Sequence, residues 1–452
     1  MSPEAPLTDL SREELIAVIR EQQRVIEQLR EEIERLKRSG QRSAAPFSKG
    51  KGKSNPKPPG RKPGQGYFRF RTAPEQTPAE VLTAEVPVQC PECGGKLDRV
   101  GEEWATTTDM VVNPQPRVTG FRVPVCRCRQ CGKPVRGTAP GLAPDQAGAT
   151  AHRLGPGVKA AAHVLHYGVG VPVRKVPQVL KELTGVSVTQ SALTQDALRQ
   201  AQGKMATHYQ QLRASVSAAP VVHTDDTGWR VAGQTAFLMG FDSEHTTVYQ
   251  IRPQHRHEEV LEVVPAEYAG VLVNDRGKSY DAHELDGVRQ QKCLAHLLRN
   301  VSEVVEQKCG MARQFGLTLK ALLRESLALW KGRPELPAEE YQGRAQQLEE
   351  KLTYHLRNRI LRDDDNQRLL NGIGGQHDRG HLLRFLFQPG VEPTNNRAER
   401  ILRPAVIARK VSHCSKNQRG AEAFSAFVSV LQTARKTHPA SLTHCLLANS
   451  SP

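Results

Sequence analysis

Four cysteines in two matched pairs place the tightest constraint on how this chain can fold. Cys90 and Cys93 form CPECGG, and Cys128 and Cys131 form CRQCGK, so glycine follows each CxxC pair. Four thiolates can close a tetrahedral zinc site, and the glycine lets the backbone curl toward sulfur. Four sulfur ligands leave no open position for water. The sequence therefore predicts a structural Zn2+ site in a zinc-ribbon-like module.

Two alternatives to this ligand set stay open. A redox-active CxxC pair would need a βαβ setting and would leave the second pair unexplained. Cys126 lies two residues before Cys128 and is an alternative fourth ligand, although the CxxC spacing favours Cys128.

Basic charge indicates the kind of partner. The 452 residues hold 63 lysines and arginines against 47 acids, a formal charge of +16 with a pI near 9.6. A chain of this length is expected to form two or more globular units, and its charge favours nucleic acid over a small metabolite. No apolar run reaches the roughly 18 residues that span a bilayer, and the start, MSPEAPLTDLSREEL, is unlike a signal peptide. We expect a cytoplasmic location and no membrane partner.

Residues 1–40 carry a heptad pattern. Isoleucines 19, 26 and 33 take the a positions, and leucines 15, 29 and 36 take the d positions. This combination favours a parallel two-stranded coiled coil, so we expect a homo-oligomer, a dimer formed through this helix. A single amphipathic helix that packs on its own globule is the alternative.

Residues 41–80 form a linker rich in lysine, arginine, glycine and proline. The stretch Arg42–Arg71 has no acid, and such a composition cannot bury a core. Uninterrupted positive charge suits contact with a phosphate backbone, whereas the alternative is an inert spacer. The predicted DNA-binding residues here are Lys49, Lys51, Lys53, Lys57, Arg61 and Lys62.

A helical region follows the zinc module. We place the zinc module at 81–145 and a helical DNA-binding region at 150–217. Within the latter, VPQVLKELTGVSVTQSALTQDALRQ predicts a helix, a turn at Gly185, and a second helix capped near Ser187 or Thr189. This resembles a helix-turn-helix, although many helical pairs of this kind touch no DNA.

The hydrophobic period changes at Pro220. The runs VVHTDDTGWRV, QTAFLMGFDS, TTVYQIRPQ and AGVLVNDRG predict strands, with the helix HEEVLEVVP among them. We therefore expect a mixed α/β core over 218–430, with a helical insertion at about 301–390 and a C-terminal tail at 431–452. The whole chain is predicted to be a multidomain α/β protein.

Acidic residues follow two of the predicted strands. Asp225 and Asp226 come after VVHT, Asp275 comes after GVLVN, and Glu399 lies in NNRAERILRP. Phosphodiester chemistry needs oxygen ligands for two Mg2+ ions, or Mn2+, about 4 Å apart. Because the chain has 47 acids, spacing alone does not single out this set.

The same motifs occur in a known order. The heptad segment and the basic linker precede CPECGG, CRQCGK, HTDDTGW, GVLVNDRGKSY, CLAHLLRN, TNNRAERILRP and RGAEAFSAFVSVLQTA. This succession, over nearly the whole chain, resembles the transposases of the insertion sequence 66 family. The order of the motifs, rather than any single one, carries the resemblance.

The resemblance implies a DDE transposase with an RNase H-like catalytic core. Asp225, Asp275 and Glu399 match the family's three acids, and the helical insertion lies between the last two. It also implies binding to the terminal inverted repeats of a mobile element, followed by metal-dependent strand cleavage and transfer of the 3′ ends into target DNA. Such a protein works in a bacterial cytoplasm, on the nucleoid while bound to DNA, and helper proteins encoded by the element are candidate partners.

The chain departs from the family at both aspartates. The family usually has Asp-Glu-Thr at the first acid, whereas this chain has Asp225-Asp226-Thr227, so a slip of the ligand by one residue stays open. Arg276 and Gly277 stand where Gly-Tyr is common.

Several neighbouring residues are candidates for supporting roles. His296 matches the family's histidine, with a packed helix face as the alternative, and Trp330 is either a stacking surface for an extruded base or a core residue. Asn395 or Asn396 is expected to cap the helix of Glu399. The cations expected to contact phosphates near the scissile bond are Arg400, Arg403, Arg409 and Lys410.

Two other functions fit the same motifs. A decayed or captured transposase would act as a DNA-binding regulator without catalysis, and a nuclease with the same core would cleave DNA without joining it.

Substitution of the cysteines tests the zinc ligands. Cys90→Ser and Cys131→Ser should lower the bound zinc and unfold the module, because a structural zinc site contributes directly to folding. Cys126→Ser, the matched control, should keep its zinc. The zinc content of each variant is measured by atomic absorption. Full zinc in the first two variants would rule out the ligand set, and loss of zinc in the third would identify Cys126 as the fourth ligand.

Overall fold

The computed structural model describes residues 16, 19, 21–26, 29, 81–82, 89, 92–96, 116–148, 151–357 and 360–437. Its two compact units are Met1–Met110 and Val111–Pro452. The predicted linker cations and Cys90 lie outside the described residues.

The described part of the heptad segment is helical. Residues 16, 19, 21–26 and 29 are in helix, and Ile19, Ile26 and Leu29 are 53%, 48% and 55% exposed. These three apolar side chains of the helix are thus about half exposed.

The second unit opens with a small hairpin and a group of helices. β1 (Val125–Arg127) pairs antiparallel with β2 (Pro134–Arg136). α2 (Pro156–His163) continues into a π-helical turn, η3 (Val164–Gly168), and is followed by α3 (Val176–Thr184), α4 (Gln190–Gln202) and α5 (Lys204–Ser217). Gly185 ends α3 with a φ of 68°, and Thr189 caps α4 by accepting a hydrogen bond from the Ala192 N–H at 3.2 Å.

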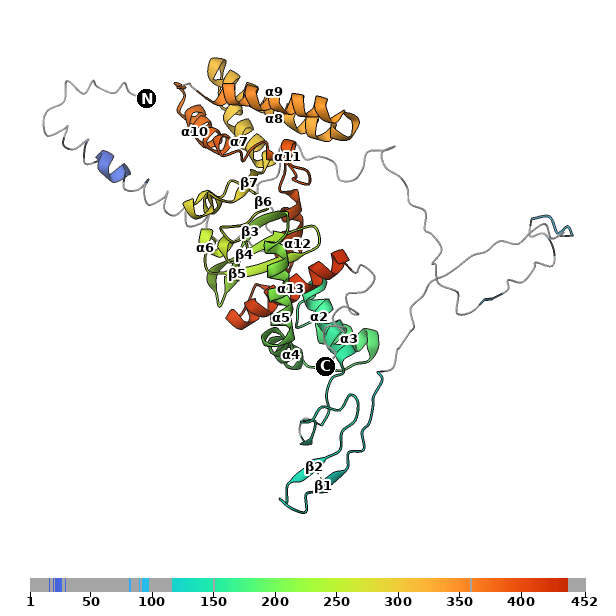
Figure 1. The fold of residues 1–452 in the computed structure, drawn as a ribbon. Coiled ribbons are helices and arrows are strands. Elements are labelled where there is room, and N and C mark those ends of the chain that lie inside the picture. The colour runs from blue at the N-terminus through green and yellow to red at the C-terminus, as the bar shows by residue number, and fades with distance from the viewer. Residues whose placement is uncertain are drawn as a thin grey trace. The chain divides into compact units, whose positions relative to one another are not determined.

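A five-stranded mixed sheet forms the centre of the unit (Figure 1). Its strands are β3 (Val221–Val231), β4 (Gln234–Asp242), β5 (Thr247–Arg252), β6 (Val271–Asn274) and β7 (Arg289–Lys292), in the order β5-β4-β3-β6-β7. β3 pairs antiparallel with β4 and parallel with β6, and β6 pairs parallel with β7. The mixed α/β prediction is confirmed.

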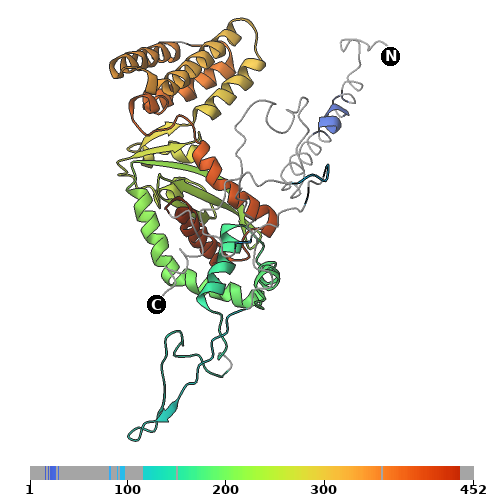
Figure 2. The ribbon, with the colours of Figure 1, turned by 90° about the vertical axis from the view of Figure 1, so that its right-hand side faces the viewer.

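Helices cover both faces of the sheet (Figure 2). α5 and α6 (His257–Leu261) pack on the face that carries Val222, Met239 and Phe241. α12 (Asn396–Ser412) and α13 (Gln418–Thr437) pack on the other face, which carries Trp229, Leu238 and Tyr249. α13 runs past residue 430, where we expected the core to end.

The helical insertion packs beside β6 and β7. It consists of α7 (Leu294–Glu306), α8 (Gly310–Lys331), α9 (Ala338–Leu356), α10 (Asp364–Asp378) and α11 (Arg384–Phe387). Single turns of 3₁₀ helix occur at η4 (Lys278–Asp281), η5 (His283–Leu285) and η6 (Arg333–Glu335). Val271 and Val273 of β6 share one apolar core with the insertion. Of the helices in the described ranges, none is both long and apolar enough to cross a bilayer.

A glycine lets α12 approach the sheet closely. Gly240 of β4 pairs with Asp225 of β3, and a Cβ at residue 240 would lie 2.9 Å from Ile401 Cδ1 and 3.2 Å from Leu402 Cδ2. No side chain at residue 240 fits without a shift of these helix residues.

Gly240→Val should push α12 away from the sheet. We expect overpacking to lower the free energy of unfolding by about 1–3 kcal/mol, more than the roughly 0.5–1 kcal/mol that a side chain gains over glycine in a strand. Ile401→Val removes the Cδ1 atom, so the double variant should recover part of the loss in denaturant unfolding. If the losses of unfolding free energy in the two single variants simply add in the double variant, the proposed contact between a side chain at residue 240 and Ile401 is wrong.

Candidate active site

Asp225 and Asp226 lie on opposite faces of β3. The partner of Asp225 across β4 is Gly240, which contacts α12, and Trp229, four residues along β3, packs with Leu402 of α12. Asp226 pairs with Met239 on the opposite face, and its Oδ2 lies 3.2 Å from His255 Nδ1. Because side chains alternate along a strand, only Asp225 faces the helix that carries Glu399.

Asp275 lies beside Asp225 across two parallel strands. The register pairs Val221 with Val271 and His223 with Val273, and its continuation by two residues aligns Asp225 with Asp275. The Gly277 N–H donates to Asp275 Oδ1 at 2.8 Å and holds this carboxylate in place.

Glu399 is in the first turn of α12. Its side chain is 41% exposed, and its Oε1 lies 3.9 Å from His296 Nε2 in the first turn of α7. The junction of the two helices is tied together, because the Asn395 N–H donates to Cys293 Sγ at 3.2 Å. The structure thus places His296 beside Glu399.

Negative charge accumulates around Asp225. Burial raises the pKa of Asp225 to about 7, and the charges of Asp275, Asp226 and Glu399 act in the same direction. Burial also raises the pKa of Asp226, whereas the nearby His255 opposes the rise. Like charges that share a site disfavour ionisation unless a cation compensates them. The cluster therefore has the electrostatic character of a cation site.

The donor set suits a hard divalent cation. Among the described residues, no three metal-ligating side chains converge closely enough to hold one ion. Mg2+, however, is usually held by one or two carboxylates together with water and substrate phosphates. Asp225 of β3 and Asp275 directly after β6 supply two carboxylates, which fit that requirement, and Glu399 adds a third oxygen donor from α12.

Buried polar residues beneath the acids were missed by the sequence analysis. Lys292 of β7 is fully buried, with its Nζ 3.0 Å from Asn274 Oδ1 and 2.8 Å from Asp281 Oδ1. His223, two residues before Asp225, is also buried, and burial lowers its pKa to about 4, so that it is neutral at pH 7. A lysine in the polar run RQQK and a histidine inside a strand were the available signals.

The predicted cations of α12 divide into two groups. Arg400, Arg403 and Lys410 are exposed along the helix. Arg409 is turned toward β3, where its Nη1 donates to Thr227 Oγ1 at 3.1 Å. Trp330 lies apart from the acids: it packs on the core of the insertion, with its ring centroid 6.5 Å from that of Phe385.

The turn between β1 and β2 holds the second cysteine pair. Gly132 has a φ of 70°, and its N–H donates to the Cys128 carbonyl at 2.9 Å. The backbone N–H groups of Cys131 and Gln130 point to the Cys128 sulfur and lower the pKa of this thiol. Cys126 lies within β1. The turn thus favours the Cys128 thiolate, the form that binds metal.

Comparison with known protein families agrees with these features. Residues 152–423 match the family model described as Transposase IS66 family, and residues 87–132 match the zinc-finger binding domain of transposase IS66. No curated protein matches the chain. The first match spans more than half of the 452 residues and includes the sheet, the insertion and α12. The chain therefore belongs to the IS66 family of DNA-binding transposases.

Proposed function

We propose that this transposase cuts DNA at the ends of its mobile element and joins the freed 3′ ends to target DNA. The proposed catalytic carboxylates are Asp225, Asp275 and Glu399. The observation that carries the proposal is that Asp225 lies in β3 and Asp275 directly follows β6, its parallel neighbour, where burial and the charges of neighbouring acids raise the pKa of Asp225 to about 7.

The sheet supports a core of the RNase H-like type. An antiparallel β3-β4-β5 meander is extended on the β3 side by the parallel strands β6 and β7. In this arrangement the first strand is central, and the first two acids come from adjacent parallel strands. The third acid comes from a helix on the same face.

The proposed reaction has two phosphoryl transfers. A water oxygen attacks the phosphorus at the element's end and loses a proton, while the bond to the 3′ oxygen breaks and that oxygen takes a proton. The freed 3′ hydroxyl then attacks a target phosphorus and loses its proton, while a second 3′ oxygen is displaced and takes a proton. When bound, Mg2+ or Mn2+ supplies positive charge at the attacking and leaving oxygens. Asp225, Asp275 and Glu399 hold the cations, and His296 supports Glu399.

Basic surfaces supply contacts to the DNA backbone in this proposal. Arg400 and Arg403 lie one and four residues after Glu399 and are exposed, so they reach phosphates next to the scissile bond. The linker cations, which lie outside the described residues, are proposed to track the backbone without regard to sequence. The heptad spacing and exposed side chains of Ile19, Ile26 and Leu29 support pairing of two chains through the N-terminal helix.

The exposed face of α4 is proposed to read the sequence of the element ends. Ser191, Gln195, Arg199 and Gln202 lie on one side of this helix and are exposed. Their hydroxyl, amide and guanidinium groups are those that bond base edges in the major groove. Asp196, the acid of this helix, is buried, where it binds Lys159 at 2.8 Å.

Replacement of two of these side chains tests the reading helix. Gln195→Ala combined with Arg199→Ala should reduce the preference for element-end DNA over scrambled duplex by at least about tenfold, since each lost bidentate contact costs roughly 1–3 kcal/mol. Affinity for the scrambled duplex should change little. Arg344→Ala, which removes an exposed arginine from α9, is the control. An unchanged preference in competition binding would refute this role for α4.

Neutral replacements test the catalytic acids. Asp225→Asn, Asp275→Asn and Glu399→Gln should each bind element ends normally but lose cleavage and joining by orders of magnitude, because a hard cation needs their negative charge. Asp226→Asn is the matched control and should cost far less, since its carboxylate faces His255. Strand cleavage and joining are measured on labelled element-end duplexes with Mg2+.

Each contrary outcome of this assay has a distinct meaning. An inactive Asp226→Asn beside an active Asp225→Asn would shift the first ligand by one residue. Cleavage without joining would identify a nuclease. Element-end binding by the wild-type protein without metal-dependent cleavage would identify a DNA-binding regulator, and activity in all four variants would remove the DDE assignment.

A further inference from the structure

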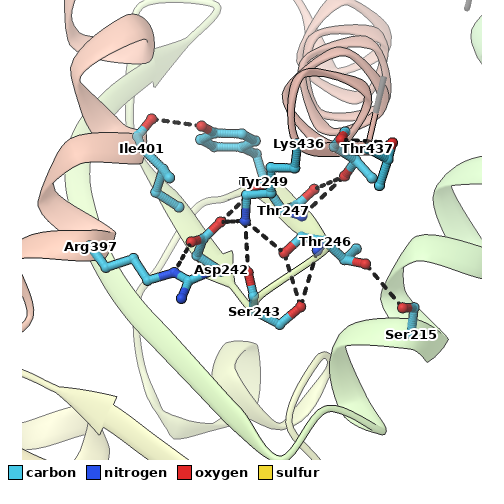
Figure 3. A network of polar contacts seen from close by, with 11 residues as sticks. Ser215, Asp242, Ser243, Thr246, Thr247, Tyr249, Arg397, Ile401, Lys436 and Thr437 are labelled. Atoms are coloured by element: carbon cyan, nitrogen blue, oxygen red, sulfur yellow. Dashed lines mark hydrogen bonds and ion pairs between the residues drawn. The ribbon is translucent and has the colours of Figure 1, made fainter. Parts of the chain in front are cut away.

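A buried carboxylate at the end of β4 forms ion pairs with cationic side chains from two different helices. Asp242 is 1% exposed. Its Oδ2 accepts from Arg397 Nε of α12 at 2.7 Å, and its Oδ1 accepts from Lys436 Nζ of α13 at 2.5 Å (Figure 3). Thr247 Oγ1 also donates to Oδ1. Arg397 and Lys436 both donate further to the Ser243 carbonyl, so this corner of the sheet is tied to both helices.

The buried side of α12 consists of Ala398, Leu402 and Ala405, which we call its seam. Arg397 and Glu399 lie on opposite flanks of this seam. Successive residues of an α-helix are about 100° apart, so Arg397 and Glu399 project to either side of Ala398. A turn of α12 about its axis that releases Arg397 from Asp242 must also displace Glu399.

The seam presents mostly small side chains to the sheet, and Arg409 further along α12 bonds to Thr227 of β3. Two of its three residues are alanines, and the helix rests on Gly240 of the sheet. Two hydrogen bonds hold the backbone near the sheet: Tyr249 Oη donates to the Ile401 carbonyl at 2.6 Å, and Asn395 Nδ2 donates to the Thr224 carbonyl at 2.7 Å. With a carboxylate at roughly 6 Å from the helix axis, a turn of about 10° moves it by about 1 Å, an error that is costly in catalysis.

We propose that the Asp242–Arg397 pair sets the rotation of α12 and thereby aims Glu399 at Asp225 and Asp275. Arg397 is a positioning residue, since it acts through the helix and through no contact with DNA. Its planar guanidinium suits the task, because Nε binds Asp242 while Nη2 binds Ser243, which fixes the direction as well as the distance. This inference rests on the proposed role of the three acids.

Lys436 provides a matched control. It binds the same carboxylate and the same Ser243 carbonyl, yet it belongs to α13, which carries none of the three acids. Loss of either cation leaves Asp242 with one charged partner. A purely structural role therefore predicts similar effects for the two substitutions, whereas a positioning role separates them.

The experiment compares Arg397→Met, Arg397→Lys and Lys436→Met in the full chain. Calorimetric titration with Mn2+, without DNA, should show binding about tenfold or more weaker for Arg397→Met, the range found when residues that orient metal ligands are lost. Arg397→Lys, which keeps the charge but not the planar fork, should fall between Arg397→Met and the wild type. Lys436→Met should lose thermal stability but bind Mn2+ like the wild type. The Mg2+ concentration for half-maximal cleavage should shift in the same order.

Several results would overturn the proposal. Equal Mn2+ affinities in Arg397→Met and Lys436→Met, at a temperature where both are folded, would leave the pair a structural role only. If Arg397→Met does not fold, a wild-type Mn2+ affinity of Arg397→Lys would likewise overturn the proposal. Failure of the proposed function itself is distinguishable, because then Glu399→Gln would also bind Mn2+ like the wild-type protein.

Discussion

Crowded negative charge at one edge of the sheet is the constraint around which the core is organised. Asp225 lies in β3 two residues beyond its last pairing with β6, and Asp275 directly follows β6. Burial, together with the charge of Asp275, raises the pKa of Asp225 to about 7. A fold that served stability alone would gain from separating these acids. We take their closeness in one cluster as the mark of a site that binds cations, as expected when perturbed titratable groups gather at one place.

The surroundings of the acids place positive charge below and beside them. Lys292 of β7 is buried and binds Asn274 of β6 and Asp281, and Arg397 and Lys436 neutralise Asp242 at another corner of the sheet. These cations have partners of their own, so the space in front of Asp225 stays negative. α12 then serves two purposes in our account. Its inner side fixes Glu399 against the sheet, and its outer side presents Arg400 and Arg403 to the DNA backbone.

The sequence predicted those parts of the core that rest on local patterns. Short β-rich runs separated by turns predicted β3 to β6, and glycine predicted the end of α3 at residue 185. β7 was missed because its sequence, RQQK, is polar. Its glutamines are nevertheless buried, because they form hydrogen bonds with distant segments. Gln291 Nε2, for example, donates to the Leu382 carbonyl. No local pattern reports such a partner.

The candidate site divides in the same way. Motif order pointed to Asp225, Asp275 and Glu399 but left a slip of the first ligand to Asp226 open. Asn395 does stand at the N-terminus of α12, but its side chain makes no capping bond and bonds Thr224 of β3. The pairing of Asp242 with Arg397 joins residues 155 positions apart and could not be read from spacing. The positions of the acids were thus within reach of the sequence, whereas the contacts that hold them were not.

Direct location of the cations tests the central claim most sharply. Crystals of the protein with nicked element-end DNA and Mn2+ would be measured for anomalous scattering at the manganese edge. The account predicts a peak between the carboxylates of Asp225 and Asp275 and a second within ligand distance of Glu399. Manganese bound instead to Asp226 and His255, on the opposite face of β3, would contradict it.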